Sequence, residues 1–176
     1  MNYSAIKTRD IANGEGVRVS LFVSGCTHFC KGCFNSEAWD FNSGNVFDEQ
    51  VEESLLKALE PSYIKGLSLL GGEPFEVQNQ RGLIDFLRKV KKKLPNKDIW
   101  CYTGYTLEKD LLSESRARCE ITDEMLSYID ILVDGEFVEE LYDIGLAFRG
   151  SSNQRILKRQ PDGTFKEIHL DRDFSQ

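Results

Sequence analysis

The chain has 176 residues, of which 40% are apolar and 29% are charged, and its formal net charge is −7. This size and composition are typical of a globular protein with a sizeable core, and the excess of acidic residues (29 against 22 basic) argues against a general nucleic-acid-binding protein. No segment approaches the ~20 apolar residues of a membrane helix. Residues 1–7 lack the apolar core of a signal peptide. We therefore expect a cytoplasmic protein that binds neither a membrane nor nucleic acid.

Strand and helix patterns alternate along the first half of the chain. Residues 17–23 alternate apolar and polar side chains and predict a strand that leads directly into Ser24-Gly25-Cys26. Apolar residues at helical spacing predict a helix over 51–59. Residues 66–70 predict a second strand, which ends in Gly71-Gly72-Glu73-Pro74.

The same alternation continues in the second half. A helical stripe covers 83–94, a strand over 99–102 ends in Thr103-Gly104, helical segments follow around 107–112 and 123–128, and a strand over 129–133 runs into Asp134-Gly135. Alternating strands and helices predict an α/β fold with a parallel sheet and right-handed crossovers. Four core strands, or five, are too few for a closed eight-stranded barrel, so we expect a partial, open barrel or curled sheet.

Two further segments have simple structural interpretations. The basic run over 88–93 is expected to be the solvated face of a helix. Residues 155–158 and 164–170 flank the turn tripeptide Pro161-Asp162-Gly163 and predict a C-terminal hairpin. We expect one domain over 1–176, in which 156–176 can form an appended hairpin and tail.

Three cysteines, Cys26, Cys30 and Cys33, form a C-x3-C-x2-C motif after the first predicted strand. In a reducing compartment such clusters are more often metal ligands than disulfide partners, and the total of five cysteines fits a full disulfide framework poorly. Three thiolates leave one position of an iron–sulfur cluster free to bind a substrate. Cys101 and Cys119 have no metal-spaced partner, and Cys101 is expected in the core.

A structural zinc site is the alternative for this motif. Zinc readily takes three cysteines and one histidine, and His28 lies within the motif. His28 would be a cramped fourth ligand in so short a loop. The spacing favours an iron–sulfur cluster over zinc but leaves zinc open.

Each predicted strand ends in a glycine or polar motif. In parallel α/β folds, sites assemble at the carboxyl edge of the strands. We therefore expect the cysteine loop, Gly71-Gly72-Glu73-Pro74, Thr103-Gly104 and Asp134-Gly135 to converge on one rim.

The segment 25–33, followed by Gly71-Gly72-Glu73-Pro74, resembles the radical S-adenosylmethionine (SAM) superfamily. Within it, the chain is similar to the glycyl-radical-enzyme activases that serve the anaerobic ribonucleoside-triphosphate reductase. The similarity runs from about Ile11 to Arg155 and includes residues 13–18, 21–26, 97–100, 102–105, 133–135 and 149–154.

This resemblance implies one [4Fe-4S] cluster held by Cys26, Cys30 and Cys33. The amino and carboxylate groups of SAM would chelate the fourth iron. Transfer of one electron into the sulfonium would then give methionine and a 5′-deoxyadenosyl radical. Because homolysis needs no acid or base, we expect no separate catalytic side chain.

The resemblance also implies which residues contact SAM. Gly71 and Gly72 would let the backbone approach its methionyl part, and Glu73 would accept a hydrogen bond from its ammonium group. Gly32 and Phe34, on either side of Cys33, would contact the adenine, unless Phe34 is a core aromatic.

The later strand ends have less specific roles in this interpretation. Thr103 and Asp134 would bind the ribose or carboxylate of SAM, or they simply end their strands. The polar run over 149–154 would bind SAM or the partner, or form a loop.

The implied activity is removal of a hydrogen atom from a backbone glycine in the large subunit of the anaerobic ribonucleoside-triphosphate reductase. A reducing protein such as a flavodoxin would supply the electron. The alternatives are a radical SAM enzyme that acts on another glycyl-radical enzyme or on a small metabolite, a zinc-stabilised interaction module, and an electron carrier.

Overall fold

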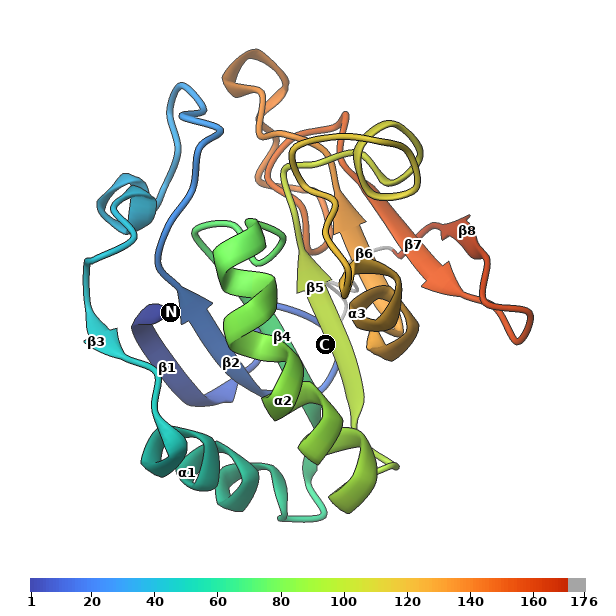
Figure 1. Ribbon diagram of the computed structural model, residues 1–176. Helices are drawn as coiled ribbons and strands as arrows, with labels where there is room; N and C mark the ends of the chain where they lie inside the picture. The colour runs from blue at the N-terminus through green and yellow to red at the C-terminus, as the bar shows by residue number, and fades with distance from the viewer. Residues whose placement is uncertain (171–176) are drawn as a thin grey trace.

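The computed structural model describes residues 1–170, and within them eight strands form one open sheet in the order β3-β1-β2-β4-β5-β6-β7-β8 (Figure 1). The strands are β1 (Asn2–Asp10), β2 (Val17–Val23), β3 (Asn45–Val46), β4 (Ile64–Gly71), β5 (Asp98–Tyr102), β6 (Ile131–Asp134), β7 (Arg155–Arg159) and β8 (Phe165–Ile168). The helices are α1 (Glu49–Leu59), α2 (Val77–Lys93) and α3 (Thr122–Tyr128), with shorter helical segments η1 (Ser36–Trp39), η2 (Leu107–Leu111) and η3 (Glu139–Leu141). The predicted α/β class is confirmed.

The centre of the sheet is parallel, as the alternation of strands and helices predicts. Strand β2 pairs with β4, β4 with β5, and β5 with β6, all in the parallel sense. The register places Val23 at the end of β2 opposite Gly71 at the end of β4. The segments that follow these four strands therefore all begin at the same edge of the sheet.

Antiparallel strands extend this centre on both sides. The predicted C-terminal hairpin is present as β7 and β8, but β7 also pairs with β6, so the hairpin continues the sheet instead of being appended to it. On the other side, β1 pairs with β2, and the two-residue β3 pairs with β1. The sequence patterns did not predict β1 or β3. The predicted tail beyond residue 170 lies outside the described residues.

The two faces of the sheet have different cover. Helices α1, α2 and α3 lie on one face and enclose the main apolar core (Figure 1). On β5, Ile99 and Cys101 belong to this core, so the prediction for Cys101 is confirmed. Trp100 instead belongs to a smaller cluster, where the ring of Phe148 packs 5.2 Å from it. Among residues 1–170, no helix has the length and apolar character needed to cross a membrane.

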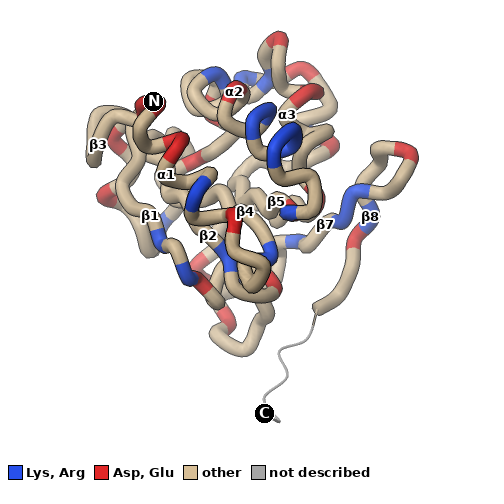
Figure 2. The backbone as a smooth tube through the Cα atoms, turned by 90° about the horizontal axis from the view of Figure 1, so that it is seen from below, with Lys and Arg blue, Asp and Glu red and all other residues tan. Residues whose placement is uncertain are grey.

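The basic run over 88–93 lies on α2, and its charges are largely paired with neighbouring carboxylates. The pairs are Arg88 with Asp85 and Glu124, Lys89 with Glu52, and Lys91 with Asp130. Figure 2 shows basic and acidic residues interspersed around α2 and α3. The prediction of a solvated helix face is confirmed.

A buried arginine connects three of the parallel strands. Arg18 on β2 has no exposed surface. Its Nε donates to Ser68 Oγ at 2.7 Å, its Nη2 to the Leu67 carbonyl at 2.9 Å and to Asp98 Oδ1 at 2.5 Å, and its Nη1 to the Glu15 carbonyl at 2.9 Å. One guanidinium thus connects β2, β4 and β5 with the loop before β2.

Replacing Arg18 by methionine is expected to lower the free energy of unfolding by about 3–5 kcal/mol, because it leaves buried acceptors and Asp98 without their partner. Urea unfolding followed by circular dichroism measures this change. Arg81→Met is the control, because Arg81 pairs with Glu120 on the surface and should matter little. Equal effects of the two substitutions would contradict the assignment of Arg18.

Candidate functional site

A cavity of about 350 Å³ opens at the carboxyl edge of the parallel strands. Its wall includes all three clustered cysteines together with Gly71, Gly72, Glu73, Thr103, Gly104 and Gly135. These residues follow β2, β4, β5 and β6, so the structure brings together the strand ends that were expected to converge. Tyr102 and Val133 line the cavity from the sheet face opposite the helices.

The cysteine loop is fastened at its start to the segment around η1. The N–H of Gly25 donates to the Ala38 carbonyl at 2.7 Å, and the N–H of Cys26 donates to the Trp39 carbonyl at 3.1 Å. Burial, with the nearby carboxylates of Glu73 and Glu76, raises the pKa of the Cys26 thiol to about 12. This thiol is therefore protonated in the metal-free protein and must lose its proton to bind a metal.

The three cysteines line one cavity and are the residues that would hold an iron–sulfur cluster. Among residues 1–170, no group of three or more Cys, His, Asp or Glu side chains is arranged to hold one metal ion. A zinc ion needs four ligands within about 2.0–2.3 Å of one point. An iron–sulfur cluster binds each thiolate on a different iron, so cysteines spaced around a cavity wall fit it. Their assignment as ligands stays a prediction.

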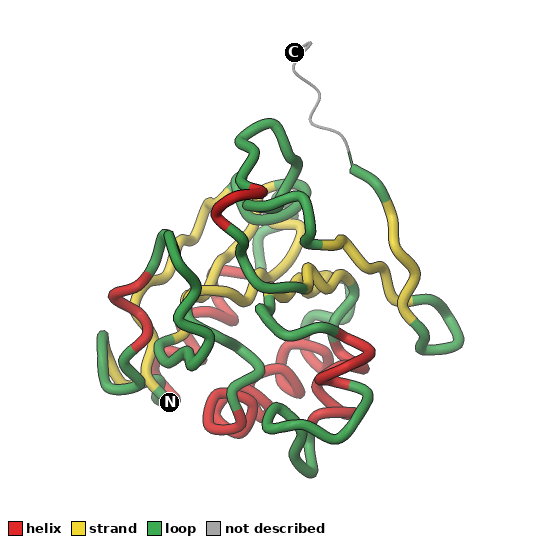
Figure 3. Tube along the Cα trace, turned by 90° about the horizontal axis from the view of Figure 1, so that it is seen from above, coloured by secondary structure: helices red, strands yellow, loops and turns green. Residues whose placement is uncertain are grey.

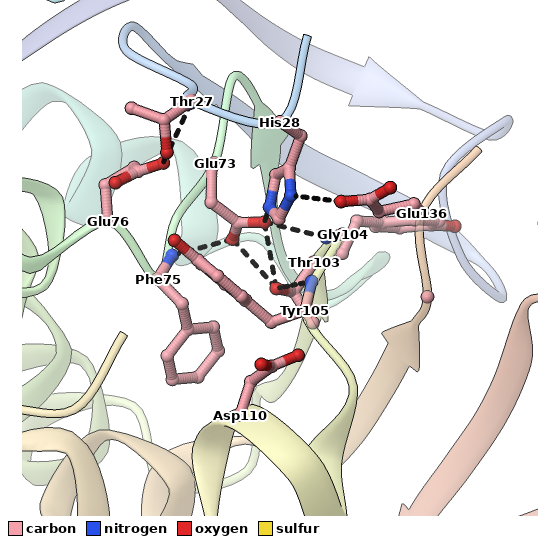
Figure 4. Close-up of polar contacts among 12 residues, drawn as sticks. Thr27, His28, Glu73, Phe75, Glu76, Thr103, Gly104, Tyr105, Asp110 and Glu136 are labelled. Carbon is pink, nitrogen blue, oxygen red and sulfur yellow. Dashed lines mark hydrogen bonds and ion pairs between the residues drawn. The ribbon is translucent and has the colours of Figure 1, made fainter. Parts of the chain in front are cut away.

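His28 is buried between two carboxylates and is not free to complete a zinc site. Its Nε2 lies 2.7 Å from Glu73 Oε1, and its Nδ1 lies 2.9 Å from Glu136 Oε1 (Figure 4). Burial acts to lower the pKa of His28, but the two carboxylates outweigh it and raise that pKa above its usual value. Because both partners are acceptors, both ring nitrogens donate. A zinc ion at His28 would have to displace one of these bonds.

The carboxylate of Glu73 connects three parts of the cavity wall. Its Oε1 accepts from His28 Nε2, from the Gly104 N–H at 2.7 Å and from Thr103 Oγ1 at 2.9 Å. Its Oε2 accepts from the Phe75 N–H at 2.8 Å, and the residue is only 1% exposed (Figure 4). Donors from the cysteine loop, from the segment after β4 and from the end of β5 therefore meet on one side chain.

Two hydrogen bonds from Thr27 also hold the cysteine loop against the segment after β4. The N–H and hydroxyl of Thr27 both donate to Glu76 Oε1, at 2.9 and 2.6 Å (Figure 4).

Gly71 has a φ of +111°, and a Cβ there would lie 2.6 Å from the backbone of Val23. Glycine at this position therefore allows β4 to end close against β2.

Some of the residues expected to contact SAM line the cavity, and others do not. Gly71, Gly72, Glu73 and Thr103 line the cavity, although the acceptor sites of Glu73 are already filled by protein donors. Phe34 also lines it and is 76% exposed, so the alternative of a core aromatic is wrong.

Gly32 and Asp134 do not belong to the cavity wall. Asp134 is 1% exposed, and its carboxylate accepts from Arg155 at 2.6 and 3.0 Å and from the Leu107 N–H at 2.9 Å. Gly32 faces the side chain of Glu139. Their contact with SAM stays a prediction that this geometry does not favour.

Sequence patterns did not identify the pairing of His28 with Glu73 and Glu136. His28 was visible within the cysteine motif, but only as a candidate ligand. Asn13 and Trp39 also line the cavity and were not singled out. Their local patterns do not indicate a site, because only the folding of the chain brings them beside the cysteines.

Residues 12–157 match the family model described as a 4Fe-4S single cluster domain. By this match, the chain belongs to the class of proteins with a 4Fe-4S single cluster domain. Relatives named anaerobic ribonucleoside-triphosphate reductase-activating protein include those of Haemophilus influenzae (46% identity, 89% of this chain and 97% of the relative), Escherichia coli K12 (41%, 89% and 97%) and Enterobacteria phage T4 (40%, 94% and 99%). The chain belongs to the family of anaerobic ribonucleoside-triphosphate reductase-activating proteins.

Replacing Glu73 by glutamine should lower the free energy of unfolding by about 2–3 kcal/mol, because the new amide N–H would face buried donors. Urea unfolding of the metal-free protein measures the change. Glu136→Gln is the matched control, since Glu136 also binds His28 but its side chain is 55% exposed. A Glu73→Gln protein as stable as Glu136→Gln would show that Glu73 does not organise the cavity wall.

Proposed function

We propose that this chain activates an anaerobic ribonucleoside-triphosphate reductase by generating a glycyl radical on its large subunit. The observation that carries the proposal is a cavity lined by Cys26, Cys30, Cys33 and residues 71–73. The chain that forms this cavity is 40–46% identical to activating proteins over about nine-tenths of its length. The names of these relatives do not favour another glycyl-radical enzyme or a small metabolite as the target.

The proposed cofactors are one [4Fe-4S] cluster, held by Cys26, Cys30 and Cys33, and SAM at the iron without a protein ligand. The match to a 4Fe-4S single cluster domain supports the cluster. Cys26, Cys30 and Cys33 would hold the cluster, which when bound would supply one electron for the cleavage of SAM. The chain contributes the positions of the ligands and the wall of the cavity.

The segment after β4 is the proposed seat of the methionyl part of SAM. A Cβ on Gly72 would lie 2.6 Å from the Gly25 carbonyl, so glycine there keeps the strand end against the cysteine loop. The carboxylate oxygens of Glu73 accept hydrogen bonds from protein donors. Its proposed role is therefore to fix the loop and both strand ends relative to one another, with its charge at the cavity wall. Phe34 offers an exposed ring to the adenine.

The four parallel strands are proposed to be the core of a partial radical SAM barrel. Because the sheet is open, the cavity can receive a loop of a large protein, which a closed barrel would hinder. A reducing protein such as a flavodoxin is the proposed electron donor.

Anaerobic reconstitution with iron and sulfide is expected to give a chain with one [4Fe-4S] cluster. After reduction, it should convert SAM into methionine and 5′-deoxyadenosine, and in the presence of the large subunit it should give a glycyl-radical doublet in electron paramagnetic resonance. Cys26→Ser, Cys30→Ser and Cys33→Ser should each lose the intact cluster and the doublet.

Cys119→Ser is the matched control and should keep both, because Cys119 lies against Gln80 and Thr122, away from the cavity. A colourless, air-stable protein that contains zinc and no sulfide would overturn the proposed cluster. An intact cluster that cleaves SAM but yields no doublet would overturn the proposed target.

A further inference from the structure

Exposed apolar side chains gather beside the mouth of the cavity. Within residues 1–170, the large apolar side chains that are well exposed on this side are Phe29 (61%), Phe34 (76%), Leu141 (43%), Tyr142 (48%) and Ile144 (75%). The other exposed large apolar side chains are Ile11, Val46, Tyr63 and Leu112. Exposed apolar side chains scattered singly are ordinary, whereas a group on one surface marks an interaction site.

Phe34, Phe137 and Tyr142 come from two distant segments and pack together, and Leu141 and Ile144 lie within two residues of Tyr142 in the chain. The ring of Phe34 lies 5.2 Å from that of Phe137 and 5.6 Å from that of Tyr142. Phe34 and Phe137 also line the cavity, so the surface begins at its mouth. Figure 3 looks down on this edge of the sheet and shows it covered mainly by loops. We call Phe34, Phe137, Leu141, Tyr142 and Ile144 the apolar rim.

The apolar rim is embedded in negative charge. Residues 136–144 contain four acidic residues and no basic one, and the chain is exposed throughout 139–145. One cation, Lys31, lies 3.7 Å from Glu139. A partner that covers this surface should therefore offer apolar side chains with basic residues around them.

We propose that the apolar rim is the docking surface for the large subunit of the reductase, which binds through the loop that bears its radical-site glycine. This inference rests on the proposed function. The glycine must reach the cavity, so the backbone that carries it comes close to the rim, two of whose residues, Phe34 and Phe137, line the cavity. The loop is expected to be apolar at its centre and to have lysine or arginine at its flanks. Burial of the rim would then contribute affinity, and its charges would favour the correct approach.

Ile144→Lys tests this proposal, because it removes an apolar contact and places a positive charge within an acidic surface. Binding of the cluster-loaded variant to the purified large subunit, measured by anaerobic calorimetry, should weaken at least about tenfold. Wild-type affinity should itself fall as the salt concentration rises. SAM cleavage without the large subunit should match wild type, which shows that the variant folds and holds its cofactors.

Ile11→Lys is the matched control. Ile11 is also 75% exposed, but it follows β1 beside the start of β2, at the opposite ends of the parallel strands from the cavity. It should bind the large subunit like wild type. The proposal is overturned if Ile144→Lys binds normally, or if both variants weaken binding equally. It is also overturned if sedimentation shows that Ile144→Lys dissociates a self-associated form of the chain, while the affinity of the variant for the large subunit is unchanged. Binding that depends on Ile144 without any glycyl radical in wild type would refute the proposed function and leave the docking surface supported.

Discussion

The arrangement of the cavity depends on a single buried carboxylate. Glu73 is almost inaccessible to water, and a charge in that position is tolerated only if protein donors replace the lost solvent. Those donors come from the cysteine loop, from the segment after β4 and from the end of β5. None of the three segments can move alone without leaving the carboxylate partly unsatisfied. The wall of the cavity therefore behaves as one unit, as a preorganised site requires.

A second buried charge performs the same task at the other edge of the sheet. Arg18 joins the start of β2 to the middle of β4 and the start of β5, whereas Glu73 joins the segments that follow the ends of these strands. Between them lie apolar strands, whose side chains pack without direction-specific bonds. The apolar core supplies most of the stabilisation, and the two charges determine how the strand ends are placed.

Sequence patterns predicted the parts of the molecule whose signals are local. The parallel strands are short apolar runs, and the cysteine motif needs only eight adjacent residues. Strand β1 was missed because Asn2–Asp10 is mostly polar and largely exposed, and it becomes a strand only by pairing with β2. In the site, the rim of glycine and polar motifs was predicted, but the partners of individual side chains were not. Asp134 illustrates the reason: its carboxylate is taken by Arg155, which arrives on β7 from the far side of a long loop.

An open sheet also has two edges, and unpaired backbone at an edge invites the strands of other molecules. Here one edge is β3, which is only two residues long. The other is β8, a four-residue strand with the charged pair Lys166 and Glu167 at its centre. Short and charged edges are poor templates for intermolecular pairing, so this protein can leave its sheet unclosed with little risk of aggregation.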